Sequence, residues 1–246
     1  MFNLEHILYM IISGIITAAL LFILAKTVKS QKNKDLILKI SALSTVIIHF
    51  SNLWVDFFKN GGTAYVEGVH LFPLFPCNAI MWMVFILSFL ENKKGLLFKL
   101  LAEYCFTIGL ICGVVGIILN QNFALNPTLS DYNVLKGMLS HSTMIFSCIY
   151  LFVGGYVRPN ISSTISAAFG VSIFIICGLA TNLICKFIGI ASPDGMWLNG
   201  APYIGISTLI LFPIALLIYF GIFALIDLRL PREERWYSKL KKHFKK

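Results

Sequence analysis

Cys77 and His141 are the two side chains best suited to nucleophilic chemistry. Cys77 follows Pro76 at the start of a long apolar run, and proline favours the first position of a helix because it has no N–H to lose and its φ is already helical. Cys77 would then lie in the first turn, where unpaired backbone N–H groups and the helix dipole stabilise a thiolate. In the other interpretation Cys77 is a small apolar core residue.

His141 lies directly after Ser140 in another apolar run. A histidine beside a thiol can take its proton, which is the minimum for nucleophilic acyl transfer. Asn78 or Asn182, with the free N–H groups at the start of the Cys77 helix, would stabilise an oxyanion. The alternative role for His141 is a hydrogen-bonded contact between helices.

A polar stripe precedes these residues in the chain. It consists of Thr45, His49, Asn52 and Asp56, whose spacing places them on one face of a helix. In lipid such a face must point to the bundle interior or to water, so the stripe predicts either a binding site or a structural polar network.

The elements that carry these residues are predicted to be membrane helices. The chain has 246 residues, of which 58% are hydrophobic and 13% charged, and its mean hydropathy is +0.82. Several apolar runs are long enough to cross a bilayer as helices, which excludes an ordinary soluble domain. These runs are too long to be the strands of a membrane barrel. We therefore expect an all-α polytopic bundle over residues 1–228, followed by a basic cytoplasmic tail over 229–246. Its seven transmembrane helices are predicted at 7–25, 36–58, 72–90, 96–119, 134–157, 161–190 and 202–226.

The basic residues predict the orientation of the bundle. With these spans, 17 of the 20 Lys and Arg residues fall on one side, and the positive-inside rule then places the N-terminus outside and the C-terminus in the cytoplasm. The net charge of +9 is therefore a topology signal rather than a nucleic-acid footprint. We expect a multi-pass protein of the cell membrane, with its tail on the anionic inner leaflet.

This topology brings polar residues of four helices to a similar depth in the outer half of the membrane. Such convergence predicts a polar pocket that opens toward the outer leaflet. The predicted substrate-binding residues are Asn78, Thr181, Asn182, His49 and Asn52. The sequence shows no Cys/His spacing typical of zinc and no nucleotide or haem motif, so we expect neither metal nor cofactor.

Three short motifs carry a family resemblance: Pro73-Leu74-x-x-Cys77, Ser140-His141 and Thr181-Asn182. In these motifs the chain resembles the bacterial YwaF family of integral membrane proteins. That family is similar to animal membrane acyltransferases that remodel ether phospholipids through a cysteine acyl-enzyme. The resemblance implies that Cys77 is the nucleophile, that His141 assists it, and that membrane phospholipid is the partner.

Two functions follow as expectations. The first is a lipid acyltransferase or lipid hydrolase that uses Cys77 and His141 near the outer leaflet. The second is a non-catalytic membrane carrier or solute-binding subunit, in which the polar stripe binds a solute or relays protons. Because the polar residues cluster near one surface and no internal repeat is evident, the sequence favours the first.

Overall fold

The chain folds as an assembly of helices in the computed structural model, which describes residues 2–59, 75–189, 194–200, 205–233 and 235–236. Each of the seven predicted spans overlaps a helix, and the described residues contain no strand, which confirms the all-α prediction. The long helices are α1 (Leu4–Thr27), α2 (Gln31–Lys59), α4 (Pro76–Phe89), α8 (Tyr132–Val153), α9 (Ser163–Phe187) and α10 (Thr208–Leu228). Between α4 and α8 lie α5 (Leu96–Tyr104), the π-helix η1 (Cys105–Gly109), α6 (Leu110–Ile118) and α7 (Gln121–Leu125), and the short 3-10 turn η2 (Gly195–Trp197) precedes α10.

Five segments among the described residues are long and apolar enough to cross a membrane. They are Leu4–Thr27, Leu96–Leu125, Tyr132–Val153, Ser163–Phe187 and Thr208–Leu228. The helix α2 is not among them, and the described part of α4 has only 14 residues. The number of seven spans and their orientation therefore stay predictions.

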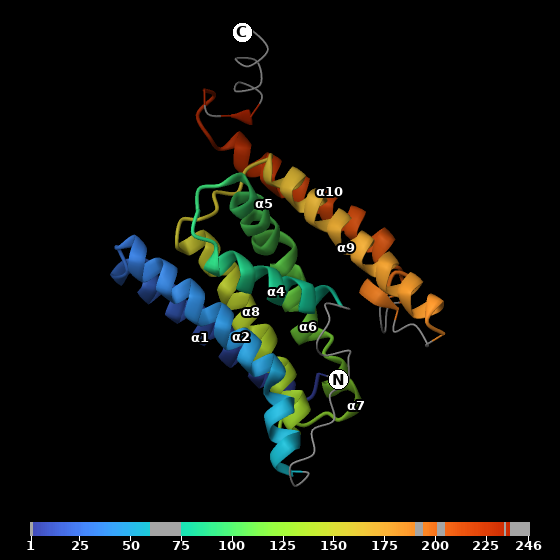
Figure 1. The fold of residues 1–246 in the computed structure, drawn as a ribbon. Coiled ribbons are helices and arrows are strands. Elements are labelled where there is room, and N and C mark those ends of the chain that lie inside the picture. The colour runs from blue at the N-terminus through green and yellow to red at the C-terminus, as the bar shows by residue number, and fades with distance from the viewer. Residues whose placement is uncertain (1, 60–74, 190–193, 201–204, 234, 237–246) are drawn as a thin grey trace.

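The helices form two groups that meet around α5 (Figure 1). The first group contains α1, α2 and α8, with α2 and α1 packed along α8. The second group is the pair α9 and α10, which run side by side, and α9 packs against α5. The helices α4 and α6 lie between the two groups.

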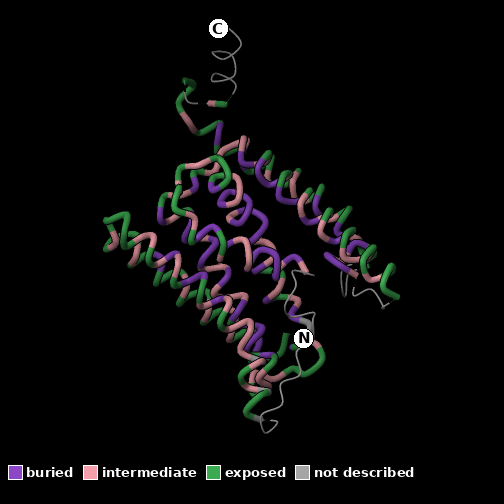
Figure 2. Tube along the Cα trace, viewed as in Figure 1, coloured by how far each residue is buried: buried purple, intermediate pink, exposed green. Residues whose placement is uncertain are grey.

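The buried side chains gather on the inner helices, whereas α1, α9 and α10 expose much of their surface (Figure 2). Much of that exposed surface is apolar, as at Ile15 and Phe22 of α1 and Leu217 and Leu225 of α10. In water such continuous apolar faces would drive aggregation, but in a bilayer they contact lipid tails.

Small residues allow α6 to approach its neighbours closely. A Cβ at Gly109 would lie 2.8 Å from Cys148 Sγ of α8 and 2.8 Å from Ile80 of α4, and a Cβ at Gly113 would lie 2.5 Å from Ile145 of α8. Gly109 at the end of η1 and Gly113 of α6 thus allow this segment to pack closely on α4 and α8.

Two hydrogen bonds join the second group of helices to α5 and to the π-helix η1. Ser166 Oγ of α9 donates to Oε2 of the buried Glu103 of α5 at 2.5 Å. The hydroxyl of Tyr219 in α10 donates to the backbone carbonyl of Thr107 in the π-helix. The Thr107 carbonyl also accepts the backbone N–H of Leu110, and a carbonyl oxygen has a second lone pair with which to bind the α10 tyrosine.

Candidate functional site

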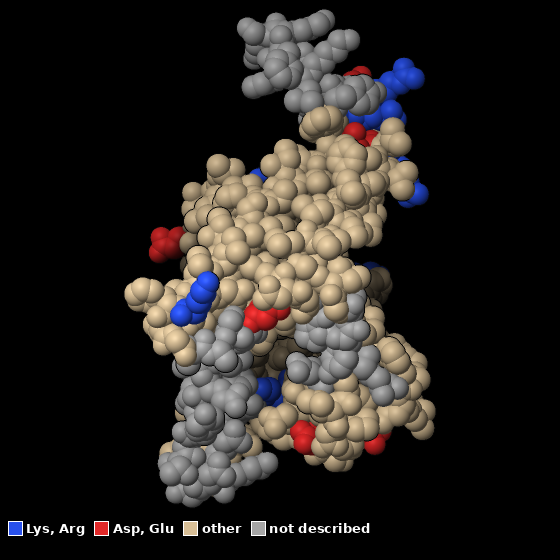
Figure 3. All heavy atoms as spheres, turned by 90° about the vertical axis from the view of Figure 1, so that its right-hand side faces the viewer, with Lys and Arg blue, Asp and Glu red and all other residues tan. Residues whose placement is uncertain are grey.

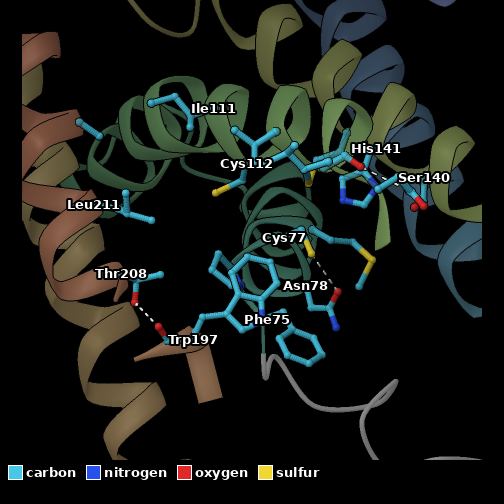
Figure 4. A pocket seen from close by; sticks show the side chains of 18 of the residues that line it. Phe75, Cys77, Asn78, Ile111, Cys112, Ser140, His141, Trp197, Thr208 and Leu211 are labelled. Atoms are coloured by element: carbon cyan, nitrogen blue, oxygen red, sulfur yellow. Dashed lines mark hydrogen bonds between the residues drawn. The ribbon is translucent and has the colours of Figure 1, made fainter. Parts of the chain in front are cut away.

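A cavity of about 720 Å³ lies between α10 and the inner helices. Its walls come from α2, the start of α4, α6 and the N-terminal half of α8 on one side, and from Trp197 and α10 on the other. Figure 3 shows a hollow on the face of the molecule that α9 and α10 border. In Figure 4 the α10 side chains and the Cys77 and His141 side chains face the open centre from opposite sides.

The helix α4 begins at Pro76, as the sequence predicts. Phe75 before it has an extended backbone (φ −116°, ψ 153°), and the first intrahelical bond runs from the Ala79 N–H to the Phe75 carbonyl at 3.1 Å. The N–H groups of Cys77 and Asn78 precede that bond, so they have no acceptor within the helix. The start of α4 therefore presents backbone donors beside the cavity that Cys77 lines.

Cys77 and Asn78 interact at the edge of the cavity. The Cys77 thiol donates a hydrogen bond to Asn78 Oδ1 at 3.5 Å, and both residues line the cavity. Asn78 is buried and Cys77 half-buried. The thiol proton is thus already oriented by a polar group, while the sulfur remains at the cavity surface.

His141 reaches the same cavity from α8. Its Nδ1 lies 2.8 Å from the carbonyl oxygen of Gly137, and because a carbonyl can only accept, Nδ1 carries the proton. In the neutral ring Nε2 then holds a lone pair and can accept a proton. The Nε2 edge packs on α6, where a Cβ at Gly116 would lie only 2.2 Å from Nε2, so glycine at this position sets the place of the ring.

The neighbours of His141 on α8 make this wall of the cavity polar. Ser140 Oγ donates to the same Gly137 carbonyl at 2.9 Å. Lys136, one turn earlier, also lines the cavity although only 7% of its surface is exposed. In the sequence, Lys136 is a lysine inside a predicted span, and it entered the topology count without being predicted as a site residue.

The polar stripe of α2 also reaches the cavity. Thr45 and His49 are lining residues, and Thr45 Oγ1 donates to the Ser41 carbonyl at 3.0 Å. Asn52 lies in α2, but its side chain is outside the described residues. The stripe thus points into the bundle at Thr45 and His49, which is where a polar face in lipid must point.

Thr181 and Asn182 lie elsewhere: neither belongs to the described lining of the cavity. Asn182 Oδ1 accepts a hydrogen bond from the Gly195 N–H at 2.8 Å, and a Cβ at Gly195 would lie 2.9 Å from Thr181 Cβ. This motif therefore holds the η2 turn against α9. Their predicted role in substrate binding stays a prediction.

The η2 turn brings Trp197 to the cavity wall, a position that the sequence did not reveal. Asp194, Met196 and Trp197 all have positive φ, at 56°, 58° and 54°, which non-glycine residues adopt at a cost. Thr208 Oγ1 donates to the Met196 carbonyl at 2.8 Å and to the Trp197 carbonyl at 3.2 Å. The Trp197 ring lies 5.5 Å from the Phe75 ring at the start of α4, so the turn connects α10 to the Cys77 region.

The described side chains include no group of three His, Cys, Asp or Glu residues suited to a metal ion. The cavity lining offers a thiol, an imidazole, amides and an ammonium group. These groups are suited to acyl transfer and to binding of an anionic or polar lipid group.

The apolar helices and the cavity among them define a membrane protein. A family model described as the TMEM164 family matches residues 1–227, so the chain belongs to the TMEM164 family. The comparisons with curated proteins and with solved structures gave no match.

Proposed function

We propose that this protein is a lipid acyltransferase or lipid hydrolase in which Cys77 is the nucleophile and His141 the general base. The observation that carries the proposal is that a thiol at a helix start and an imidazole whose Nδ1 is bound to a backbone carbonyl line one cavity. Neither a thiol nor a histidine in a membrane helix is informative alone. Together beside a cavity they form the nucleophile and base that acyl transfer requires.

The apolar lining of the cavity supports a lipid as substrate. Ile111 and Val115 of α6 line it together with Leu211, Ile214 and Ile218 of α10. An acyl chain along this wall is shielded from polar groups, and its ester would lie toward Cys77 and His141. The cavity volume of about 720 Å³ is within the range of sites that enclose most of a small ligand.

The proposed reaction has two halves. His141 Nε2 takes the thiol proton, the Cys77 sulfur attacks the ester carbonyl carbon, and the C–O bond of the ester breaks. The leaving alcohol takes the proton back from His141, which leaves an acyl thioester on Cys77. The hydroxyl of a lysolipid, or water, then gives its proton to His141 and attacks the thioester carbonyl carbon. The C–S bond breaks, the new ester or free fatty acid leaves, and His141 returns the proton to the sulfur, which restores the thiol. The backbone N–H groups of Cys77 and Asn78 are placed to stabilise the oxyanion in both halves.

We also propose the membrane arrangement in which this reaction would occur. Residues 1–228 form the bundle with its N-terminus outside, the cavity opens toward the outer leaflet of the cell membrane, and residues 229–246 form a cytoplasmic tail. The charge distribution along the chain supports this arrangement. Cysteine labelling on intact cells tests this orientation. Single cysteines are introduced at 30 and at 130 in a protein without other reactive thiols, and a membrane-impermeant maleimide is added. Only the cysteine at 130 should react.

Purified protein with a phospholipid that carries a labelled acyl chain tests the function. Cys77→Ala and His141→Ala should abolish acyl transfer or hydrolysis, while Cys112→Ala, which changes another thiol in the cavity wall, should keep it. Full activity of Cys77→Ser would contradict a thiolate nucleophile.

A carrier or solute-binding subunit is the second candidate, favoured by His49 and Thr45 in the cavity wall. Solute uptake that survives Cys77→Ala but is lost in His49→Ala would support this candidate over the enzyme. Loss of both lipid turnover and solute uptake in Cys77→Ala would contradict the carrier function, because a carrier does not need the Cys77 thiol as a nucleophile.

A further inference from the structure

Lys136 is a buried cation at the polar end of the cavity. Only 7% of its surface is exposed, and it lines the cavity together with Asn120 and Asn122. Removing an ammonium group from water is costly unless anions or hydrogen-bond acceptors surround it. An ammonium has three N–H donors, so Lys136 can hold a neighbouring protein group and still bind an oxygen of a ligand.

The two asparagines add neutral donors beside Lys136. Asn120 Nδ2 donates to the Gly116 carbonyl at 3.3 Å, and Asn122 Nδ2 donates to the Asn133 carbonyl at 3.3 Å. Each amide nitrogen carries two N–H groups, and one of them is used in each of these bonds. The arrangement combines one cation with further amide N–H groups, which is the chemistry that binds a phosphate.

The cavity is polar at this end and apolar at the other. The lining residues of α6 start at Ile111, and the lining continues beyond the end of α6 to Asn120, the N-cap of α7. From Ile111 to the last residue of α6, Ile118, the helix rises by about 10 Å. On α8, Lys136 precedes His141 by five residues, which corresponds to about 7.5 Å along the helix axis. The reactive pair therefore lies between the cationic end and the apolar wall.

We propose that Lys136 binds the headgroup phosphate of a glycerophospholipid, with Asn120 and Asn122 beside it, and that this contact selects phospholipids over neutral glycerolipids. In a glycerophospholipid the acyl esters are a few bonds from the phosphorus, and the acyl chains extend beyond them. A phosphate at Lys136 thus brings an ester to Cys77 and His141 and directs the chains along α6 and α10. The inference deepens the proposed function and rests on it for the direction of the lipid, but not for the binding itself.

Binding to Cys77→Ala protein tests the phosphate site without any need for catalysis. Native mass spectrometry of this protein in detergent would compare dioleoyl phosphatidylglycerol with dioleoylglycerol, which has the same chains and no phosphate. Adding Lys136→Gln should weaken phosphatidylglycerol binding by about tenfold, the loss expected for one hydrogen bond to a charged group, and should leave dioleoylglycerol binding unchanged. Lys136→Arg should keep the preference for phosphatidylglycerol.

Lys186→Gln is the matched control, because Lys186 is an exposed lysine on α9 away from the cavity lining. It removes the same charge and should change neither affinity. Equal loss for both lipids in Lys136→Gln, or no loss, would overturn the inference.

Inorganic phosphate in excess over lipid distinguishes the source of the phosphate. It should not displace phosphatidylglycerol from the Cys77→Ala protein, because the acyl chains contribute most of the affinity. Complete displacement would mean that the site binds free phosphate, and would overturn the lipid assignment. This arm needs no variant of Lys136, so it holds even if Lys136→Gln fails to fold. A lipid preference with no thioester on Cys77 in the wild type would reject the proposed enzyme while keeping the phosphate site.

Discussion

Replacing Gly116 with alanine tests whether His141 must lie where the structure places it. The new Cβ would be 2.2 Å from His141 Nε2 and 2.1 Å from Cδ2, whereas ordinary van der Waals contact begins near 3.4 Å. The ring would have to move by about 1.2 Å, and a displacement of about 1 Å in a catalytic group can cost on the order of 100-fold in rate. We therefore expect the rate of thioester formation on Cys77, followed by intact-mass spectrometry with a phospholipid donor, to fall by about 100-fold.

Gly113→Ala provides the matched control on the same helix. Its Cβ would lie 2.5 Å from Cγ1 of Ile145, so it strains the packing of α6 on α8 without touching His141. We expect Gly113→Ala to lower the thermal stability but to change the rate by far less than Gly116→Ala does.

A double-mutant cycle separates the role of the ring from general damage. Gly116→Ala should destabilise the protein by about 1–3 kcal/mol, as overpacking of a filled site does. In the His141→Ala background that cost should largely disappear, because the clashing ring is gone. A folded Gly116→Ala protein that forms the thioester at the wild-type rate would refute the assignment of His141 as the base.

Three further predictions concern the contacts that hold the cavity together. Asn182→Ala removes the acceptor of the Gly195 N–H and should cost about 1–3 kcal/mol of stability, measured by thermal unfolding in detergent; an unchanged melting temperature would mean that the η2 turn does not need this bond. Tyr219→Phe removes the donor to the Thr107 carbonyl and should cost about 0.5–1.5 kcal/mol of stability in the same assay. It should also speed the exchange of bound lipid, because α10 loses one of its contacts. A loss of stability without faster lipid exchange would mean that the bond has only a local effect. Ser166→Ala leaves the buried Glu103 without its hydrogen-bond donor and should destabilise the protein by about 1–3 kcal/mol, whereas Ser172→Ala on the exposed face of α9 should change little; equal effects would contradict a specific role for the Glu103 contact.

The sequence predicted the helices well because their signals are local. Proline at the start of α4 and the glycines of α6 act through backbone geometry and through the absence of a side chain, and both are readable in one chain. The placement of Cys77 and His141 at one cavity was inferred from depth in the membrane, which depends only on residue counts.

The remaining parts of the site depend on contacts between distant segments. Trp197 reaches the cavity through a turn with three positive φ values, and of these positions only Asp194 is a residue type that favours such a backbone. Asn182 accepts a hydrogen bond from the Gly195 N–H of that turn, a contact that the sequence pattern did not indicate, while its role in substrate binding stays a prediction. Gly116 faces an imidazole rather than another helix backbone, and Lys136 lies in the cavity wall rather than at a solvated helix end. These outcomes follow from the packing of α6, α8, α9 and α10, which periodicity alone does not determine.

The central claim is that Cys77 carries an acyl group, and intact-mass spectrometry tests it most directly. The protein is incubated with its own membrane lipids and measured before and after hydroxylamine. We expect a mass gain equal to one fatty acyl chain that hydroxylamine removes, that is absent in Cys77→Ala and that persists in Cys112→Ala. No acyl adduct on wild-type protein, or an adduct that persists in Cys77→Ala, would show that Cys77 is not the nucleophile.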